Sequence, residues 1–447
     1  MPYYPLGRIF LLLLGAVLAE GQGTSTNYWP AAEWRTSSPE RQGVDSRDLA
    51  RIFGTVRARQ IPIHGLIVIR NGYLVLEAYF HPFSTGNVHD LASVTKSVMS
   101  TLIGIAIDKG YIKSVDQPVL DFFPGRRSPR MDDRWKRLTV KHLLTMTSGF
   151  CEDFRSGEQQ LTRMRLTQDW VQFLLDNPFV SDPGERFAYC SCASNLLSSV
   201  LTSATGLNAR AFAKKHLYGP LGISNVIWPE DPHGNSTGWG DSYLLPSDLA
   251  RIGYLFLQGG VWNNRQVVSG GWIRDATRKQ VEVSGGEGYG YKWWVLREPP
   301  GAFEARGRGG QRIVVLPSKR LVVVVTGIGR FQPGDLGAAL LSSVRSDEPL
   351  PEDPVATRAL SEKIAEAARP PEKKALAPLP EMAHTVSGRT FRFGSNPYGL
   401  KTMQLRFRRT GEGVVRFGFQ FVVGGAKVRM IDEGVGEFQL DATAENR

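Results

Sequence analysis

The chain contains 447 residues, of which 42% are hydrophobic and 22% charged, and it includes 10 Trp and 22 Phe. This composition excludes an intrinsically disordered chain and indicates a folded globular protein, and the length predicts two or three domains. The net charge of +11 could attract nucleic acid. Because the sequence shows no basic run with interleaved aromatic residues and no DNA-binding motif, we interpret the charge as spread over the surface and expect no nucleic-acid partner.

The first 19 residues have the layout of a secretory signal peptide. Arg8 is followed by an apolar run, IFLLLLGAVLA, that ends in a small-x-Ala sequence at Ala19. The alternative is an uncleaved anchor, but the run is shorter than the roughly 20 residues that span a bilayer. No cysteine stands at the expected cleavage point, which argues against a lipoprotein anchor. We therefore expect a secreted or periplasmic protein without a stable membrane anchor.

A helix and a hairpin are the first elements expected after this segment. Residues 46–59 have helical character, with Asp45 or Ser46 as N-cap. Residues 64–80 read HGLIVIRNGYLVLEAYF, in which Asn71-Gly72 separates two β-branched runs, a strong signal of a β-hairpin. These segments predict an antiparallel sheet, on which the helix of the next segment packs.

The stretch 91–110, LASVTKSVMSTLIGIAIDKG, contains a Ser-x-x-Lys motif at Ser93 and Lys96. Apolar residues recur at helical spacing and Gly110 follows as a C-cap, which predicts a buried helix opened by Ser93. Residues three apart share a helix face, so the Lys96 amine should lie within reach of the Ser93 hydroxyl, as a base beside a nucleophile. The helix N-terminus disfavours a protonated lysine there. Ser-x-x-Lys also occurs by chance, so other segments must decide whether it is catalytic.

The segment 116–280 is mainly helical with Gly- and Pro-rich breaks, and we interpret it as a helical lobe. The last helix of this lobe should have Ser247 or Asp248 as N-cap. The predicted helices span 140–146, 167–175, 194–205, 209–217 and 247–257, and strands return at 290–296, 311–316 and 321–326.

The C-terminal part of the chain reads differently from the rest. Seven prolines in residues 349–380 surround a helical piece at 355–369 and predict a linker. Residues 381–447 alternate apolar and polar residues, which predicts a small β-domain. The main domain would then cover residues 28–348.

The chain has three cysteines, at positions 151, 190 and 192. An odd number leaves at least one unpaired, and export would permit one disulfide. Cys190 and Cys192 are too close in sequence to pair easily, so the possible bond joins Cys151 to Cys190 or Cys192. No Cys or His spacing resembles a zinc or iron site, and we expect neither a metal nor an organic cofactor.

Taken together, the motifs of this chain resemble the serine β-lactamase and penicillin-binding protein superfamily, in particular its class C-like branch of esterases, D-amino-acid peptidases and 6-aminohexanoate-dimer hydrolases. The resemblance covers roughly residues 40–345 and implies an α+β fold in which an antiparallel sheet is flanked by helices. It is carried by LASVTKSVMSTLIG at 91–104, LTVKHLLTMTSGF at 138–150, PGERFAYCSCASNLLSSVLTSATG at 183–206, LLPSDLARIGYLFLQGGVW at 244–262, YGYKWWV at 289–295 and GRGGQRIVVLP at 307–317.

The resemblance implies roles for further residues, and the sequence departs from the family's motifs at two places. Tyr189 stands in the place of the tyrosine of the family's Tyr-x-Asn motif, where a phenol beside a lysine ammonium is expected to have a lowered pKa and to relay a proton. Ser191 replaces the Asn of that motif. The third motif, Lys/His-Thr/Ser-Gly, has no clean match. Its strand lends an N–H to the oxyanion hole beside the N–H of Ser93, and alignment makes Arg308 the donor, with Gly309 permitting close approach of substrate.

The resemblance implies a serine hydrolase that cleaves an ester or amide of a small molecule through an acyl-enzyme on Ser93, most similar to the 6-aminohexanoate-dimer hydrolases. The alternatives are a β-lactamase, a D-amino-acid peptidase or DD-carboxypeptidase, and a non-catalytic member that binds peptidoglycan or a partner. In penicillin-recognising relatives, the third motif's cation and hydroxyl hold the carboxylate next to the β-lactam ring. The hydroxyl is absent here, so we expect weak β-lactam hydrolysis. The sequence predicts neither the exact substrate nor the oligomeric state.

Overall fold

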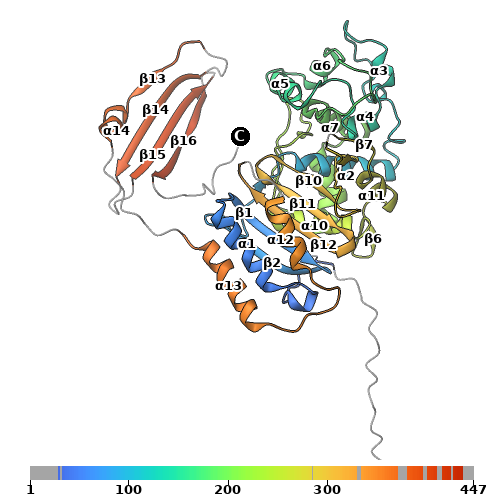
Figure 1. Ribbon diagram of the computed structural model, residues 1–447. Helices are drawn as coiled ribbons and strands as arrows, with labels where there is room; N and C mark the ends of the chain where they lie inside the picture. The colour runs from blue at the N-terminus through green and yellow to red at the C-terminus, as the bar shows by residue number, and fades with distance from the viewer. Residues whose placement is uncertain are drawn as a thin grey trace, which may run out of the picture.

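The computed structural model describes residues 29–30, 33–283, 285–329, 334–370, 380–395, 400–409, 415–423 and 426–435. The predicted signal peptide, residues 1–19, lies outside the described residues. Among the described residues, no helix is both long enough and apolar enough to cross a membrane. Figure 1 shows a large antiparallel sheet with helices on both faces, a region of shorter helices beside it, and a separate C-terminal sheet.

The large sheet is assembled from both ends of the main domain, as the sequence predicts. The Asn71-Gly72 turn has positive φ angles of 52° and 81° and joins the first two strands, which confirms the predicted hairpin. Neighbouring strands are antiparallel throughout. In spatial order the strands are β2 (Tyr73–Tyr79), β1 (Ile63–Arg70), β12 (Leu321–Gly327), β11 (Arg312–Leu316), β10 (Phe303–Arg306), β9 (Trp294–Val295), β8 (Gly288–Tyr289) and β7 (Val281–Glu282).

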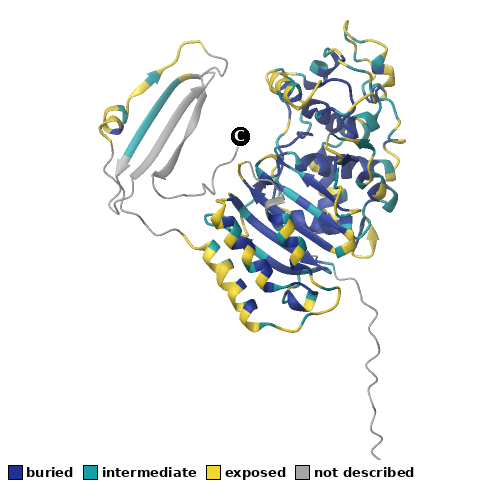
Figure 2. Cartoon of the chain, in the orientation of Figure 1, coloured by how far each residue is buried: buried dark blue, intermediate teal, exposed yellow. Residues whose placement is uncertain are grey.

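Successive side chains along the strands of this sheet point alternately into two apolar cores, one on each face. Helices cover both faces and complete these cores. Val323 and Val325 belong to the core shared with α1 (Ser46–Ala58) and α12 (Gly334–Ser343). Val322 and Val324 belong to the larger core, which contains α2 (Val94–Asp108) and α10 (Pro246–Leu257). Figure 2 shows the sheet as almost wholly buried between these layers. Helix α2, which carries the Ser-x-x-Lys motif, is therefore held rigidly at the centre of the molecule.

Most predicted helices are present, with shifted ends. Helix α1 begins after Asp45, whose side chain accepts hydrogen bonds from two backbone N–H groups, as predicted. The predicted N-cap of α10 is wrong: Leu245 occupies that position, and Pro246 forms the first turn because proline is preorganised for it. The helices of the lobe are α3 (Arg134–Arg137), α4 (Val140–Leu144), α5 (Phe154–Arg165), α6 (Trp170–Leu175), α7 (Ser191–Thr205), α8 (Ala209–Ala213), α9 (Gly219–Leu221) and α11 (Gly270–Thr277).

Several elements had no counterpart among the predicted ones. Helix α5 lies between two predicted helices, in a segment where no helix is predicted. Helix α12 follows the last strand of the main domain, where the sequence also predicts none. Of the strand predicted at 290–296, residues 294–295 form β9, while β8 ends at Tyr289 and a tight turn at Lys292, whose φ is 64°, separates the two. The remaining short strands are β3 (His89–Asp90), β4 (Tyr243–Leu244), β5 (Val261–Trp262) and β6 (Arg265–Gln266).

The C-terminal part contains a helix that packs back on the main domain and a separate sheet. Helix α13 (Pro354–Ala368) contacts α1, and its Leu360 is buried in the α1 core. The following elements are α14 (Glu381–Val386), β13 (Thr390–Arg392), β14 (Leu400–Arg409), β15 (Val415–Val423) and β16 (Ala426–Val435), whose four strands pair in sequence order. Strands are thus present where the sequence predicts them, and the division into domains stays a prediction.

Candidate active site

A cavity of about 790 Å³ lies over the N-terminus of α2, between the edge of the large sheet and the helical lobe. Its walls come from segments that are far apart in the sequence. The sheet contributes Trp294, Arg306 and the loop after β10, and the lobe contributes α5 and the residues before α7. All of the predicted site residues except Lys96 line this cavity: Ser93, Tyr189, Ser191, Arg308 and Gly309.

Ser93 sits at the N-cap of α2, as predicted, with φ −73° and ψ −6°. The preceding residue, Ala92, has a φ of 45°, a left-handed conformation that is uncommon for a residue with a Cβ and often marks functional sites. The hydroxyl of Ser93 is partly exposed to the cavity and accepts a hydrogen bond from Lys96 Nζ at 2.9 Å. The structure thus places the two residues of the motif in contact.

Lys96 is buried, and its amine also donates to the backbone carbonyl of Trp239 at 2.6 Å. Burial lowers the pKa of Lys96 from 10.5 to about 7, while the negative charges of Glu158 and Asp241 raise it by a smaller amount. An amine with this pKa is neutral in about half of the molecules at pH 7. Lys96 can therefore take a proton from Ser93 at neutral pH.

Tyr189 lies on the other side of the nucleophile. Its phenol is hydrogen-bonded to Ser93, and Lys96 Nζ lies 5.0 Å from the centre of its ring. Trp294 stacks parallel to the ring at 6.2 Å. The expected lowering of the Tyr189 pKa is wrong: burial raises it well above 10, and the hydrogen bond to Ser93 offsets only part of the rise. Tyr189 is therefore a neutral phenol at neutral pH, able to donate a proton.

Ser191, which replaces the asparagine of the family motif, points to α5. Its hydroxyl donates a hydrogen bond to Glu158 at 2.7 Å. Glu158 also lines the cavity, and its charge acts on both Lys96 and Tyr189. The sequence did not point to Glu158, because helix α5 was not predicted and a single glutamate carries no motif.

The loop after β10 reaches the nucleophile through its glycines. A Cβ on Gly307 would lie 2.5 Å from the Leu91 carbonyl oxygen, so only glycine allows this strand end to approach the start of α2 so closely. Gly309 has a φ of 83°, which also favours glycine. The close approach places Arg308 and Gly309 on the wall of the cavity beside Ser93.

The two arginines of this loop have different surroundings. Arg306 is held by ion pairs to Glu287 and Glu304, and its guanidinium lies 4.5 Å from the centre of the Trp294 ring. The Arg308 side chain is exposed, and its charge acts on both Asp90 and Lys96. Arg308 is thus the cation of this loop that remains available to a ligand.

Two groups near Lys96 were missed by the sequence analysis. The Trp239 carbonyl, which accepts a hydrogen bond from Lys96, is a backbone oxygen, and a backbone oxygen leaves no signal in a sequence. Lys292 is a second buried lysine, with Nζ 2.9 Å from Ser194 Oγ and 3.1 Å from Met146 Sδ. Burial holds its pKa well below 10.5. Lys292 is thus a second amine beneath the site whose protonated form burial disfavours.

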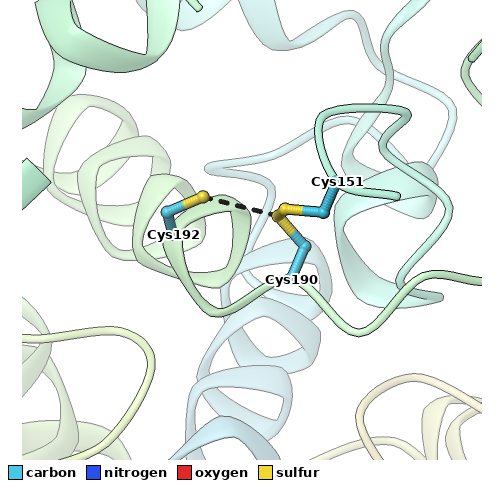
Figure 3. Close-up of side chains that lie close together, drawn as sticks. All are labelled: Cys151, Cys190 and Cys192. Carbon is cyan, nitrogen blue, oxygen red and sulfur yellow. Dashed lines mark hydrogen bonds between the residues drawn. A yellow bond between two sulfur atoms is a disulfide. The ribbon is translucent and has the colours of Figure 1, made fainter. Parts of the chain in front are cut away.

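The three cysteines gather directly behind Tyr189. Cys151 forms a disulfide with Cys190, which confirms one of the two predicted pairings. Cys192 is a free, buried thiol whose Sγ lies 3.4 Å from the Cys190 sulfur. Figure 3 shows the three side chains converging from the loop after α4 and the first turn of α7.

A nucleophile, a base with a lowered pKa and a neutral acid in one cavity are the groups that acyl transfer requires. The model of the beta-lactamase family matches residues 49–341. The chain belongs to the beta-lactamase family. The match confirms the superfamily, the fold and the class of enzyme, a serine hydrolase, that the motifs indicated.

Individual relatives of this beta-lactamase family member agree with that assignment. The chain is 27% identical over 282 residues to a 6-aminohexanoate-dimer hydrolase of Paenarthrobacter ureafaciens, covering 58% of this chain and 70% of the relative. It is 28% identical over 156 residues to monacolin J acid methylbutanoyltransferase of Aspergillus terreus, covering 31% of this chain and 37% of the relative. These names span hydrolysis and acyl transfer.

Solved structures share the fold at low sequence identity. A putative 6-aminohexanoate-dimer hydrolase from Bacillus anthracis superimposes with a TM-score of 0.58 and 18% identity, covering 70% of this chain and 86% of the other. A penicillin-binding protein homologue from Pyrococcus abyssi gives a TM-score of 0.55 and 19% identity, covering 86% of this chain and 98% of the other. At these identities the likeness establishes the fold alone.

Proposed function

We propose that this protein hydrolyses a small ester or amide through a covalent acyl-enzyme on Ser93. The observation that carries the proposal is the 2.9 Å contact between the Ser93 hydroxyl and a Lys96 amine whose pKa burial lowers to about 7. Ser93 would otherwise be a weak nucleophile at neutral pH, and an adjacent neutral amine activates it. The accessible serine and the intact Lys96 and Tyr189 argue against the alternative of a non-catalytic binding member.

The proposed steps use Ser93, Tyr189 and Arg308, which line the cavity, and the buried Lys96 that contacts Ser93. Neutral Lys96 accepts the proton of Ser93 as its oxygen attacks the substrate carbonyl, and the N–H groups of Ser93 and Arg308 stabilise the oxyanion. Tyr189 donates its proton to the leaving alcohol or amine and is reprotonated by Lys96. A water molecule then attacks the acyl-enzyme and gives a proton to the neutral Lys96 amine, which returns a proton to the Ser93 oxygen as the acid product leaves.

The substrate that we favour is a small ester or a short linear amide. The similarity to a 6-aminohexanoate-dimer hydrolase supports an amide of this kind, and the similarity to an acyltransferase supports an ester. The cavity offers charge for both ends of a zwitterion, since Glu158 and Arg308 both line it. A β-lactam or a D-amino-acid peptide is the second candidate, because Arg308 could bind a carboxylate.

The test is covalent labelling of purified protein with a fluorophosphonate probe, combined with turnover of p-nitrophenyl esters. Ser93→Ala should abolish labelling and lower turnover by several orders of magnitude, because it removes the nucleophile and little else. Ser100→Ala is the matched control: this serine lies on the same helix, is buried, and its hydroxyl has no hydrogen-bond partner among the described residues. Turnover by folded Ser93→Ala within about tenfold of wild type would contradict the assignment.

We also infer that the protein is exported through a signal peptide at residues 1–19. The supporting observation is the charged, then apolar, then small-residue order of this segment. Expression in the native host with N-terminal sequencing of the extracytoplasmic protein is the test. A mature chain that still begins at Met1 would overturn the inference.

A further inference from the structure

The cysteine cluster behind Tyr189 contains a third thiol in addition to the two cysteines of the disulfide. Cys151, Cys190 and Cys192 are all buried, and their sulfur atoms all lie within 4.8 Å of one another. The third thiol, Cys192, has no covalent partner. Sulfur is the ligand that zinc and related borderline metal ions prefer, and Cys-x-Cys places two such ligands on one turn of backbone.

The distances in this cluster match those of a small metal site. Zn–S bonds of roughly 2.3 Å and Zn–O bonds of roughly 2.1 Å place neighbouring ligands of a tetrahedron about 3.6 to 3.8 Å apart. Cys190 Sγ and Cys192 Sγ are 3.4 Å apart. Gln160 Oε1 lies 3.3 Å from Cys192 Sγ and 3.7 Å from Cys151 Sγ. The bonded pair, Cys151 and Cys190, would have to separate.

The oxygen of Gln160 is fixed toward the sulfurs by its neighbours. The amide nitrogen of Gln160 donates to the Phe150 carbonyl at 2.8 Å, and Asn177 donates to the Gln160 oxygen at 3.0 Å. These two bonds determine which end of the amide faces the cluster. Outer hydrogen bonds of this kind hold the ligands of known metal sites in place. The cluster therefore has a preoriented oxygen as a fourth ligand.

We propose that these four groups form a latent site for one zinc-class divalent cation, which competes with the Cys151–Cys190 disulfide. A dithiol supplies two electrons and two protons to the disulfide and becomes a disulfide itself, whereas a phosphine supplies two electrons and becomes a phosphine oxide, with water supplying the oxygen and the two protons; either reductant gives thiols at Cys151 and Cys190. Binding of the cation then releases the protons of the three thiols, and each thiolate donates an electron pair to the metal. The oxidised protein holds the disulfide and no ion at this place.

Cobalt is the probe for this site, because Co²⁺ occupies zinc sites and gives thiolate-to-metal charge-transfer absorption. The full-length protein is reduced anaerobically with a phosphine and titrated with Co²⁺, while circular dichroism follows its fold. We expect one Co²⁺ per chain with thiolate absorption, displacement by Zn²⁺, and protection of three thiols from alkylation. The oxidised protein should show none of these.

Two variants separate this site from adventitious binding. Cys192→Ser keeps the disulfide of the oxidised protein and should weaken Co²⁺ binding to the reduced protein by at least about 100-fold. Gln160→Leu should weaken it by about 10-fold or more, since one ligand is lost. Binding without thiolate absorption, or with equal strength in Cys192→Ser, would overturn the proposal. If reduction unfolds the protein, added Zn²⁺ must restore the native spectrum, and failure to do so would also overturn it.

Discussion

At the scale of single residues, burial displaces the pKa values of the two groups beside Ser93 in opposite directions. The Lys96 pKa falls to about 7, and the Tyr189 pKa rises well above 10, because burial disfavours the charged form of each. At neutral pH the amine is then available as a base and the phenol as an acid. This separation of the two pKa values assigns the role of base to Lys96 and the role of acid to Tyr189, and no further motif is needed.

Tyr189→Phe tests the role of the phenol, because it keeps the ring and its stacking on Trp294. We expect kcat to fall by about 100-fold or more, the usual range for a general acid, with little change in the melting temperature. The measurements are steady-state kinetics and thermal unfolding on the same preparation. Normal turnover by the folded fraction of a variant that melts much earlier would make Tyr189 a structural residue.

The lowered pKa of Lys96 predicts an acid limb in the pH profile. Lys96 must be neutral to accept the Ser93 proton, so kcat/KM should fall about tenfold per pH unit below about pH 7. The activity decreases toward low pH because Lys96 becomes protonated there and can no longer accept the Ser93 proton. The profile is measured between pH 4 and 9 with a neutral ester, and Tyr189→Phe should retain the same limb. An acid limb near pH 4 to 5 would instead indicate a carboxylate as the base.

At the scale of elements, the tyrosine depends on how the chain before α7 is fixed. A Cβ on Gly157 of α5 would lie 2.7 Å from the Tyr189 carbonyl oxygen and 3.2 Å from the Cys190 Cα, so α5 packs directly on this backbone. The disulfide joins the same segment to Cys151, at a sequence separation of 39. Helix α5 and the disulfide together hold Tyr189 beside Ser93.

Cys151→Ala should therefore lower the free energy of unfolding and the rate of turnover. A disulfide closing a loop of this length stabilises the folded chain by about 4 kcal/mol in the chain-entropy model. Urea unfolding with and without reductant measures the effect, and the variant should no longer respond to reductant. Cys192→Ala is the control and should cost only about 1 kcal/mol, as a small loss of packing. An equal loss of unfolding free energy in both variants would show that the packing of the sulfur atoms, and not the disulfide bond, stabilises the protein.

The elements that were predictable are those whose signal is local. Asn71-Gly72 and the Ser93 helix follow from turn chemistry and helical spacing. Helix α5 was missed because its sequence, FRSGEQQLTRMR, is mostly polar and includes Gly157. The reason for that glycine is tertiary, the close approach to the Tyr189 backbone, and no local pattern reports it. The Trp239 carbonyl that binds Lys96 was unpredictable for the same reason.

At the scale of the whole molecule, the predicted α+β fold is present, and its site lies where the sheet meets the lobe. The predicted linker contains α13, which packs on α1 through Leu360 and an ion pair between Arg57 and Glu366 of 2.8 Å. Helix α13 is therefore packed against α1, although it lies within the predicted linker. Proline content predicts the linker as a change of composition but carries no information on this packing, and the linker stays a prediction.

The shape and charge of the whole cleft bear on which substrate class it accepts. Arg306 is held by Glu287 and Glu304 on the sheet side, which leaves the exposed Arg308 as the cation of the loop after β10 for a substrate carboxylate; Arg165 and Arg312 also line the cavity. The hydroxyl of the family's third motif is absent. Because a mobile guanidinium positions a carboxylate poorly, a β-lactam should lose roughly 2–4 kcal/mol of transition-state binding, about 30- to 1000-fold in kcat/KM.

We therefore expect p-nitrophenyl butyrate or a 6-aminohexanoate dimer to be turned over faster than nitrocefin. The measurement is kcat/KM for the three substrates on one preparation, with Arg308→Gln as the comparison. Since the proposed oxyanion donor is the backbone N–H of Arg308 and not its side chain, Arg308→Gln should leave hydrolysis of the neutral ester within about threefold and lower any nitrocefin activity further. Nitrocefin as the fastest substrate, with kcat/KM near about 10⁶ M⁻¹s⁻¹, would mean that the Arg308 side chain does anchor the carboxylate.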